Sequence, residues 1–92
     1  MADNEVAAEV EVKEFGAYIV ADPRICHGQL TFRGTRILVT VVLDQVASGM
    51  DWADITRSWR GKVSHQAITE AVTLAANALV STHDQYRLAA AG

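Results

Sequence analysis

Apolar residues recur at helical spacing in three stretches of the C-terminal two-thirds of the chain. The first, residues 39–48, ends before Gly49, where Thr40 is a candidate start cap and the glycine a candidate helix stop. Asp51 is a suitable N-cap for a second, short helix over residues 52–59. Ser64 is a suitable cap for a third, which we expect to fray beyond about Thr82. We therefore predict three helices within residues 39–82.

The segment before these helices, residues 17–38, has β-type character. A short strand is expected at residues 18–20, where Asp22-Pro23 ends it, because proline disfavours regular structure at this point. Cys26-His27-Gly28 marks a second turn, and two extended pieces, residues 30–33 and 34–37, are expected to meet at Gly34. The predicted fold is mainly α, with a small N-terminal β element followed by three helices. Residues 5–12 fit either a helix or a strand.

Length and charge limit the possibilities further. Ninety-two residues form one domain with a modest core, which favours a homodimer. No apolar run reaches about 20 residues and no secretory signal is recognisable, so we expect a cytoplasmic protein without membrane association. The net charge of −3 is uneven: residues 1–16 hold five acidic residues and one lysine, so the remainder is near neutral. We interpret residues 1–16 as an acidic extension whose deletion should leave the fold of residues 17–92 intact.

Several residues together resemble a known family. They are Asp22-Pro23, Gly28, the run Arg33-Gly34-Thr35-Arg36-Ile37, Val39, Gly49, Ile55 and the helix that begins at Ser64. On these residues, the segment 18–78 resembles the domain-of-unknown-function 433 family, which is regarded as VapB-like antitoxins. The resemblance implies a homeodomain-like helix-turn-helix, no catalysis and, as partner, a PIN-like ribonuclease toxin. The chain departs from the family pattern at Leu30, where proline is common, and at Trp59-Arg60, which replaces an aromatic-proline pair.

The start of the third predicted helix is a candidate DNA-binding site. In a helix-turn-helix, this end of the second helix of the pair enters the major groove. Polar side chains that can read base edges lie there, and cations that can bind phosphates precede them; the set comprises Ser64, His65, Gln66 and Thr69, with Arg57, Arg60 and Lys62. The alternative is a three-helix packing unit whose polar face is only solvated.

Two further pairs are candidates for partner contacts. Arg33 and Arg36 flank Gly34-Thr35 and could bind phosphate or carboxylate groups, or could stabilise the turn, for example by pairing with Asp22. Trp52 and Trp59 are seven residues apart and lie near the same face of the second helix. Core packing is their default role, and an interface anchor is the alternative.

The remaining candidate chemistry is weak. The side chains of Cys26, His27, His65 and His83 lack the paired spacing of a zinc site, and no nucleophile, base and orienting group are evident. We therefore predict neither an enzyme nor a metal or other cofactor. The resulting hypothesis is a type II antitoxin that binds its promoter DNA and neutralises a PIN-like toxin. The alternative hypothesis is a dimeric protein-interaction module without DNA binding.

Overall fold

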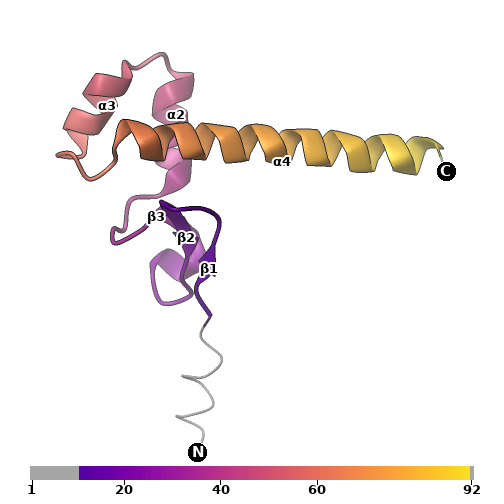
Figure 1. The fold of residues 1–92 in the computed structure, drawn as a ribbon, viewed down its shortest axis with the longest axis horizontal. Coiled ribbons are helices and arrows are strands. Elements are labelled where there is room, and N and C mark those ends of the chain that lie inside the picture. The colour runs from indigo at the N-terminus through magenta and orange to yellow at the C-terminus, as the bar shows by residue number, and fades with distance from the viewer. Residues whose placement is uncertain (1–10, 92) are drawn as a thin grey trace, which may run out of the picture.

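The computed structural model describes residues 11–91. Three short strands come first, with one turn of 3₁₀ helix at Cys26–Gly28 between the second and the third strand, and three α-helices follow (Figure 1). The strands are β1 (Lys13–Glu14), β2 (Ile19–Ala21) and β3 (Leu30–Phe32), and the helices are α2 (Val39–Ala47), α3 (Trp52–Ser58) and α4 (His65–Ala91). The expected mainly α fold with a small N-terminal β element is therefore confirmed.

The strands form one antiparallel sheet in the order β1-β2-β3. Ile19 of β2 stands opposite Phe32 of β3, and both side chains are buried, so this pair anchors the sheet to the helices. β1 pairs with β2 through Lys13 and Glu14. The sheet therefore begins before residue 17, within the segment interpreted as an acidic extension.

The two predicted extended pieces are separated by a turn at residues 33–35. The chain then returns beside β3, where the amide of Phe32 donates to the carbonyl oxygen of Ile37 at 3.1 Å and Leu38 forms an antiparallel bridge with Thr31. Gly34 has a φ of +76°, which allows the amide of Thr35 to donate to the carbonyl oxygen of Phe32 at 3.0 Å. The Thr35 hydroxyl group donates to the same carbonyl oxygen at 2.8 Å and accepts from the amide of Ile37 at 3.0 Å. These bonds direct the chain from β3 into α2.

Each of the three helices contributes one completely buried residue to the centre of the core. Val42, Ile55 and Ile68 are completely buried, and Ile19 and Phe32 extend the same core to the sheet. The core thus joins α2, α3, the first third of α4 and one face of the sheet. Such mutual burial of apolar surface is the main force that holds a small domain together.

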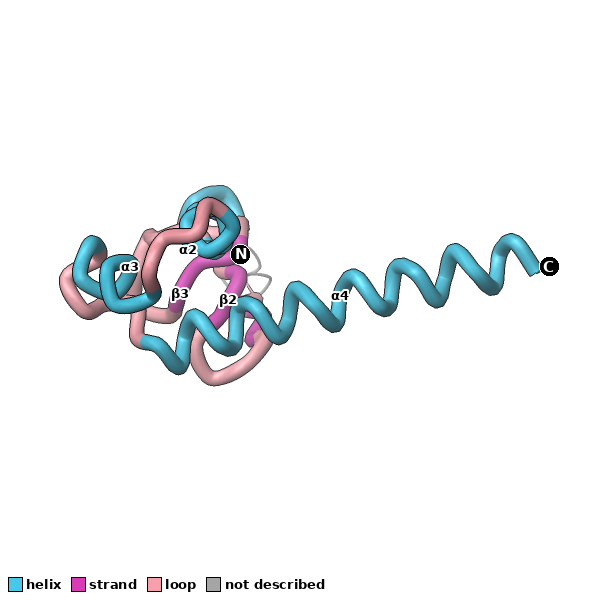
Figure 2. The backbone as a smooth tube through the Cα atoms, turned by 90° about the horizontal axis from the view of Figure 1, so that it is seen from above, coloured by secondary structure: helices cyan, strands magenta, loops and turns pink. Residues whose placement is uncertain are grey.

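α4 is longer than expected. The helix was predicted to fray near Thr82, but its 27 residues continue to Ala91. Figures 1 and 2 show that its C-terminal half runs past the rest of the molecule. The extension agrees with the high helix propensity of alanine, which is frequent in this segment.

Candidate nucleic-acid interface

The connection between α3 and α4 brings the candidate cations to the surface. Arg60 and Gly61 both have positive φ, +56° and +77°. The Arg60 amide donates to the carbonyl oxygen of Arg57 at 3.0 Å, and the Gly61 amide donates to that of Thr56 at 2.9 Å. These two carbonyl groups near the end of α3 are therefore hydrogen-bonded by the turn that follows the helix. The chain then reverses, and α4 starts four residues after Gly61.

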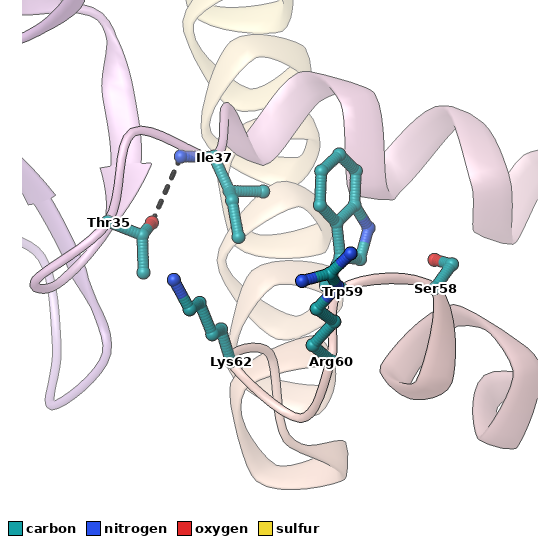
Figure 3. Close-up of a pocket in the computed structure, with 6 residues that line it drawn as sticks. All are labelled: Thr35, Ile37, Ser58, Trp59, Arg60 and Lys62. Atoms are coloured by element: carbon teal, nitrogen blue, oxygen red, sulfur yellow. Dashed lines mark hydrogen bonds between the residues drawn. The ribbon is translucent and has the colours of Figure 1, made fainter.

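Arg60 and Lys62 are exposed on this turn. They line a shallow hollow of about 320 Å³ with Thr35, Ile37, Ser58 and Trp59. Figure 3 shows the Lys62 side chain extending from the α3–α4 turn toward Thr35. Among residues 11–91, neither cation forms an ion pair. Both charges are therefore available to an anionic ligand.

Arg57 differs from these two cations. Its guanidinium group binds the Asp54 carboxylate at 2.9 Å, three residues earlier on the same helix. An exposed pair of this kind contributes at most about 1 kcal/mol, so a phosphate can displace it. Until that happens, the net charge of the pair is zero. Arg57 is consequently a weaker candidate than Arg60 or Lys62.

The start of α4 divides the four predicted base-reading residues into two groups. The Ser64 hydroxyl group accepts from the amide of Ala67 at 3.1 Å, so Ser64 acts as the predicted N-cap and is already engaged. The His65 ring lies edge-on to Trp52, with ring centroids 6.1 Å apart. Gln66 and Thr69 are exposed, and among residues 11–91 no hydrogen bond engages their side chains. They are therefore the polar side chains of this end that neither a hydrogen bond nor a ring contact engages.

The two arginines of the Gly-Thr turn do not act together. Arg33 binds the carbonyl oxygens of Ala17 at 3.0 Å and Gly16 at 3.3 Å, and also the Glu14 carboxylate at 3.2 Å. It therefore fastens the loop between β1 and β2 to the end of β3. Arg36 is exposed and does not bind Asp22.

Asp22 pairs with Arg24 instead. Two bonds join their side chains, at 3.0 and 2.9 Å, and the Arg24 amide donates to the same carboxylate at 2.9 Å. The hydrogen bonds from Arg24 hold the pKa of Asp22 below its ordinary value. This local clamp closes the turn that follows β2.

Both tryptophans pack against the core. Trp59 donates from Nε1 to the side-chain oxygen of Gln45 at 2.8 Å, which ties the end of α3 to α2. Trp52 is half-buried against the core and contacts His65. These contacts favour the packing role of both residues over the interface role.

The sequence analysis did not identify the structural role of Glu70. Its carboxylate accepts from the amides of Ala17 at 2.9 Å and Tyr18 at 2.7 Å, and so joins α4 to the start of β2. The only signal in the sequence is that Glu70 is the one acidic residue in the first half of α4. A contact across 52 and 53 residues leaves no local pattern.

Within residues 11–91, no group of three His, Cys, Asp or Glu side chains is arranged to hold a metal ion. In the same residues, no helix is apolar over a length that would cross a membrane.

A comparison with known families matches residues 19–75 to the family described as "Protein of unknown function (DUF433)". The chain belongs to the DUF433 family. The matched part of this DUF433 protein contains β2, β3, α2, α3 and the packed part of α4. No curated protein and no solved structure matches the chain.

Proposed function

We propose that this DUF433 protein is a type II antitoxin that binds the DNA upstream of its own reading frame and neutralises a PIN-like ribonuclease toxin. The observation that supports DNA binding is the surface formed by Arg60, Lys62, Gln66 and Thr69. It combines two cations without carboxylate partners among the described residues and two polar side chains without hydrogen bonds. In this proposal, α2, α3 and α4 form a homeodomain-like helix-turn-helix, and α4 is the recognition helix.

The geometry of this surface fits a duplex. The N-terminal end of a helix carries a partial positive charge and enters the major groove readily. Arg60 and Lys62 lie immediately before this end, where phosphates flank the groove. The glutamine side chain of Gln66 can donate to and accept from adenine at the same time, so it is the best base-reading candidate.

The acidic net charge does not oppose the proposal. Residues 1–16, with five acidic residues and one lysine, carry more negative charge than the whole chain, whose net charge is −3, whereas Arg60 and Lys62 are on a surface of the folded domain. Association with DNA depends on the local patch that meets the phosphates. The toxin part of the proposal rests on the family resemblance, and co-purification with the product of the adjacent reading frame tests it directly.

Fluorescence anisotropy with the upstream duplex and a scrambled duplex, at several salt concentrations, tests DNA binding. Arg60→Ala and Lys62→Ala should weaken binding to both duplexes and lower the salt slope by about one each. Gln66→Ala should weaken binding to the upstream duplex by about 1–3 kcal/mol and leave the scrambled duplex almost unaffected.

Arg87→Ala is the control for net charge, because it removes one exposed cation at the far end of α4, where Arg87 pairs with Asp84 at 3.7 Å. If Arg87→Ala weakens binding as much as Lys62→Ala does, the effect is one of net charge and the proposed surface is wrong. If the protein, with and without the toxin, shows no preference for the upstream duplex at low salt, the DNA-binding proposal fails.

A dimeric protein-interaction module without DNA binding is the second candidate. The observation that favours it is the exposed apolar surface on the projecting half of α4, where Leu79 is 71% and Tyr86 79% exposed. This candidate predicts association between proteins without salt-dependent binding to the promoter.

A further inference from the structure

The C-terminal half of α4 contacts little of its own domain. Within residues 75–89, no side chain is buried, although this stretch includes Leu79 and Tyr86. At 1.5 Å per residue, residues 75–91 extend about 25 Å. Figure 2 shows this part of α4 projecting away from the sheet and the other helices. A helix of such length gains most of its stability from packing, and here nothing in the described chain supplies it.

The apolar residues of this projecting half continue a stripe that begins in the core. Along α4, the stripe follows steps of four and three residues, as in a coiled coil: Ile68, Val72, Ala75, Leu79, Thr82, Tyr86 and Ala89. Ile68 is completely buried and Val72 is half-buried, whereas the members from Ala75 onward are exposed. The stripe contains no charged residue. The face of α4 that packs on the domain therefore continues, uncharged and mostly apolar, along the solvent-exposed half of the helix.

An apolar groove lies where the projecting half leaves the domain. It measures about 250 Å³, and its walls are almost entirely apolar. Four residues come from the sheet region and the start of α2, and four from α4: Phe15, Ile19, Leu30 and Val39, with Ala71, Leu74, Ala75 and Ala78. Three of the four α4 residues are alanines, so the helix side of the groove has room for a large side chain.

We propose that a second copy of this chain occupies the stripe and the groove, with the two α4 helices antiparallel. A twofold axis between Val80 and Ser81 places Leu79 of each copy opposite Thr82 of the other. The same axis places Tyr86 opposite Ala75, at the groove, and Val72 opposite Ala89. Each layer then contains one large and one small side chain, which is the complementarity that close packing requires.

The stripe itself indicates this occupant and this direction. In a parallel pair, Tyr86 would face Tyr86 and Ala75 would face Ala75, so large and small layers would alternate with poor packing. A twofold interface must be complementary to itself, and the antiparallel arrangement satisfies this condition because each arm fills the groove of the other. A face without charge offers nothing to the phosphates of a nucleic acid.

The pairing does not rest on the proposed DNA binding. Gln66 lies on the other side of α4 from the stripe, and Thr69 flanks the stripe one turn before Val72, since helix positions repeat every 3.6 residues. Both precede Val72, the first stripe residue that the second copy covers. Their exposed side chains stay accessible in the dimer. Loss of one property therefore leaves the other measurable.

Sedimentation and light scattering of the full-length chain test the pairing. Leu79→Asp and Tyr86→Asp should each weaken the dimer by at least about tenfold, because they introduce a charge into a dry layer. Val80→Asp is the matched control: Val80 is the exposed neighbour of Leu79, but its position is rotated by about 100° around α4 and lies outside the stripe. It should leave the dimer unchanged. Circular dichroism should show folded protein in all three variants, since the three positions are 58–79% exposed.

Spin labels attached at Gln66→Cys, in a chain carrying Cys26→Ser, test the direction. In the antiparallel pair, 29 residues separate the two labelled positions along the helices, so the labels should be about 44 Å apart. A parallel pair would place the two labelled positions at the same level on the outer sides of the paired helices, about 20 Å apart. A distance near 20 Å, equal effects of Val80→Asp and Leu79→Asp, or a monomer at about 100 µM would each overturn the proposal.

Discussion

Glu70 allows a quantitative test of how α4 is joined to the sheet. Its carboxylate accepts from two backbone amides, those of Ala17 at 2.9 Å and Tyr18 at 2.7 Å. A hydrogen bond to a charged group contributes about 1.5–3 kcal/mol when buried, and a neutral one about 0.5–1.5 kcal/mol. These two bonds lie near the surface, so about 1 kcal/mol for each is appropriate. Glu70→Ala should therefore lower the free energy of unfolding by about 2 kcal/mol.

For a domain of this size, 1 kcal/mol shifts the Tm by about 4–8 °C, so Glu70→Ala should lower the Tm by about 8–16 °C. Calorimetry and urea unfolding measure both quantities. Glu70→Gln keeps one acceptor oxygen but turns an NH₂ donor toward the second backbone amide, so it should lose at least half as much. A decrease of less than about 2 °C for Glu70→Ala would refute the argument, because the two bonds would then contribute nothing beyond their exchange with water.

Gly16 provides an independent check of the same contact. A Cβ atom at this position would collide with the Glu70 carboxylate, whose atoms can move only by giving up the two bonds. Gly16→Ala should therefore destabilise the protein by up to about 2 kcal/mol. In a Glu70→Ala background, the same substitution should cost almost nothing, so the two changes should be strongly non-additive. Additive effects in this double-mutant cycle would show that Gly16 and Glu70 do not interact.

Three further predictions concern the β region. Gly34→Val should destabilise the protein by about 1–3 kcal/mol, because a φ of +76° is strained for a residue with a side chain. Lack of space is not the reason, since a Cβ atom there meets nothing within 4 Å. A urea midpoint equal to that of the parent protein would contradict this prediction. Deletion of residues 1–16 should lower the Tm, against the expectation from sequence, because it removes β1; calorimetry decides. The Arg24 guanidinium group lowers the pKa of Asp22 on folding, so the stabilisation is complete above pH about 4 and is lost as the pH falls through the lowered pKa. Acid unfolding of Asp22→Asn should lack this part of the pH dependence.

At the candidate site, the helix cap could be predicted from the sequence, but the side-chain contacts could not. The cap formed by Ser64 was predictable, because an N-cap depends on residues within one helical turn. Its consequence, that Ser64 is engaged and that Gln66 and Thr69 are the free polar groups, needed coordinates. Arg57 and Lys62 are both cations in the sequence, but only the structure shows that Asp54 pairs with Arg57.

The sequence by itself determined the elements whose signals are local. The periodic apolar positions placed α2 and α3 within a residue or two of their observed bounds, and Gly49 has the positive φ expected after α2. β2 and β3 were recognisable because each is a short run rich in β-branched or aromatic residues that ends at turn residues, Asp22-Pro23 after β2 and Gly34 after β3. In each case, neighbouring residues decide the conformation.

Only the tertiary structure decided the features that join distant segments. β1 is two exposed residues long and has no pattern of its own, so its existence depends on the edge that β2 offers. Arg33 and Glu70 could equally have been solvated side chains, and their partners are 16 to 53 residues away. The length of α4 is not such a feature, because its C-terminal half is exposed and its alanines favour a helix locally. Local propensity cannot specify the pairing of β1 or the contacts of Arg33 and Glu70, since their free energy appears only once the chain has folded.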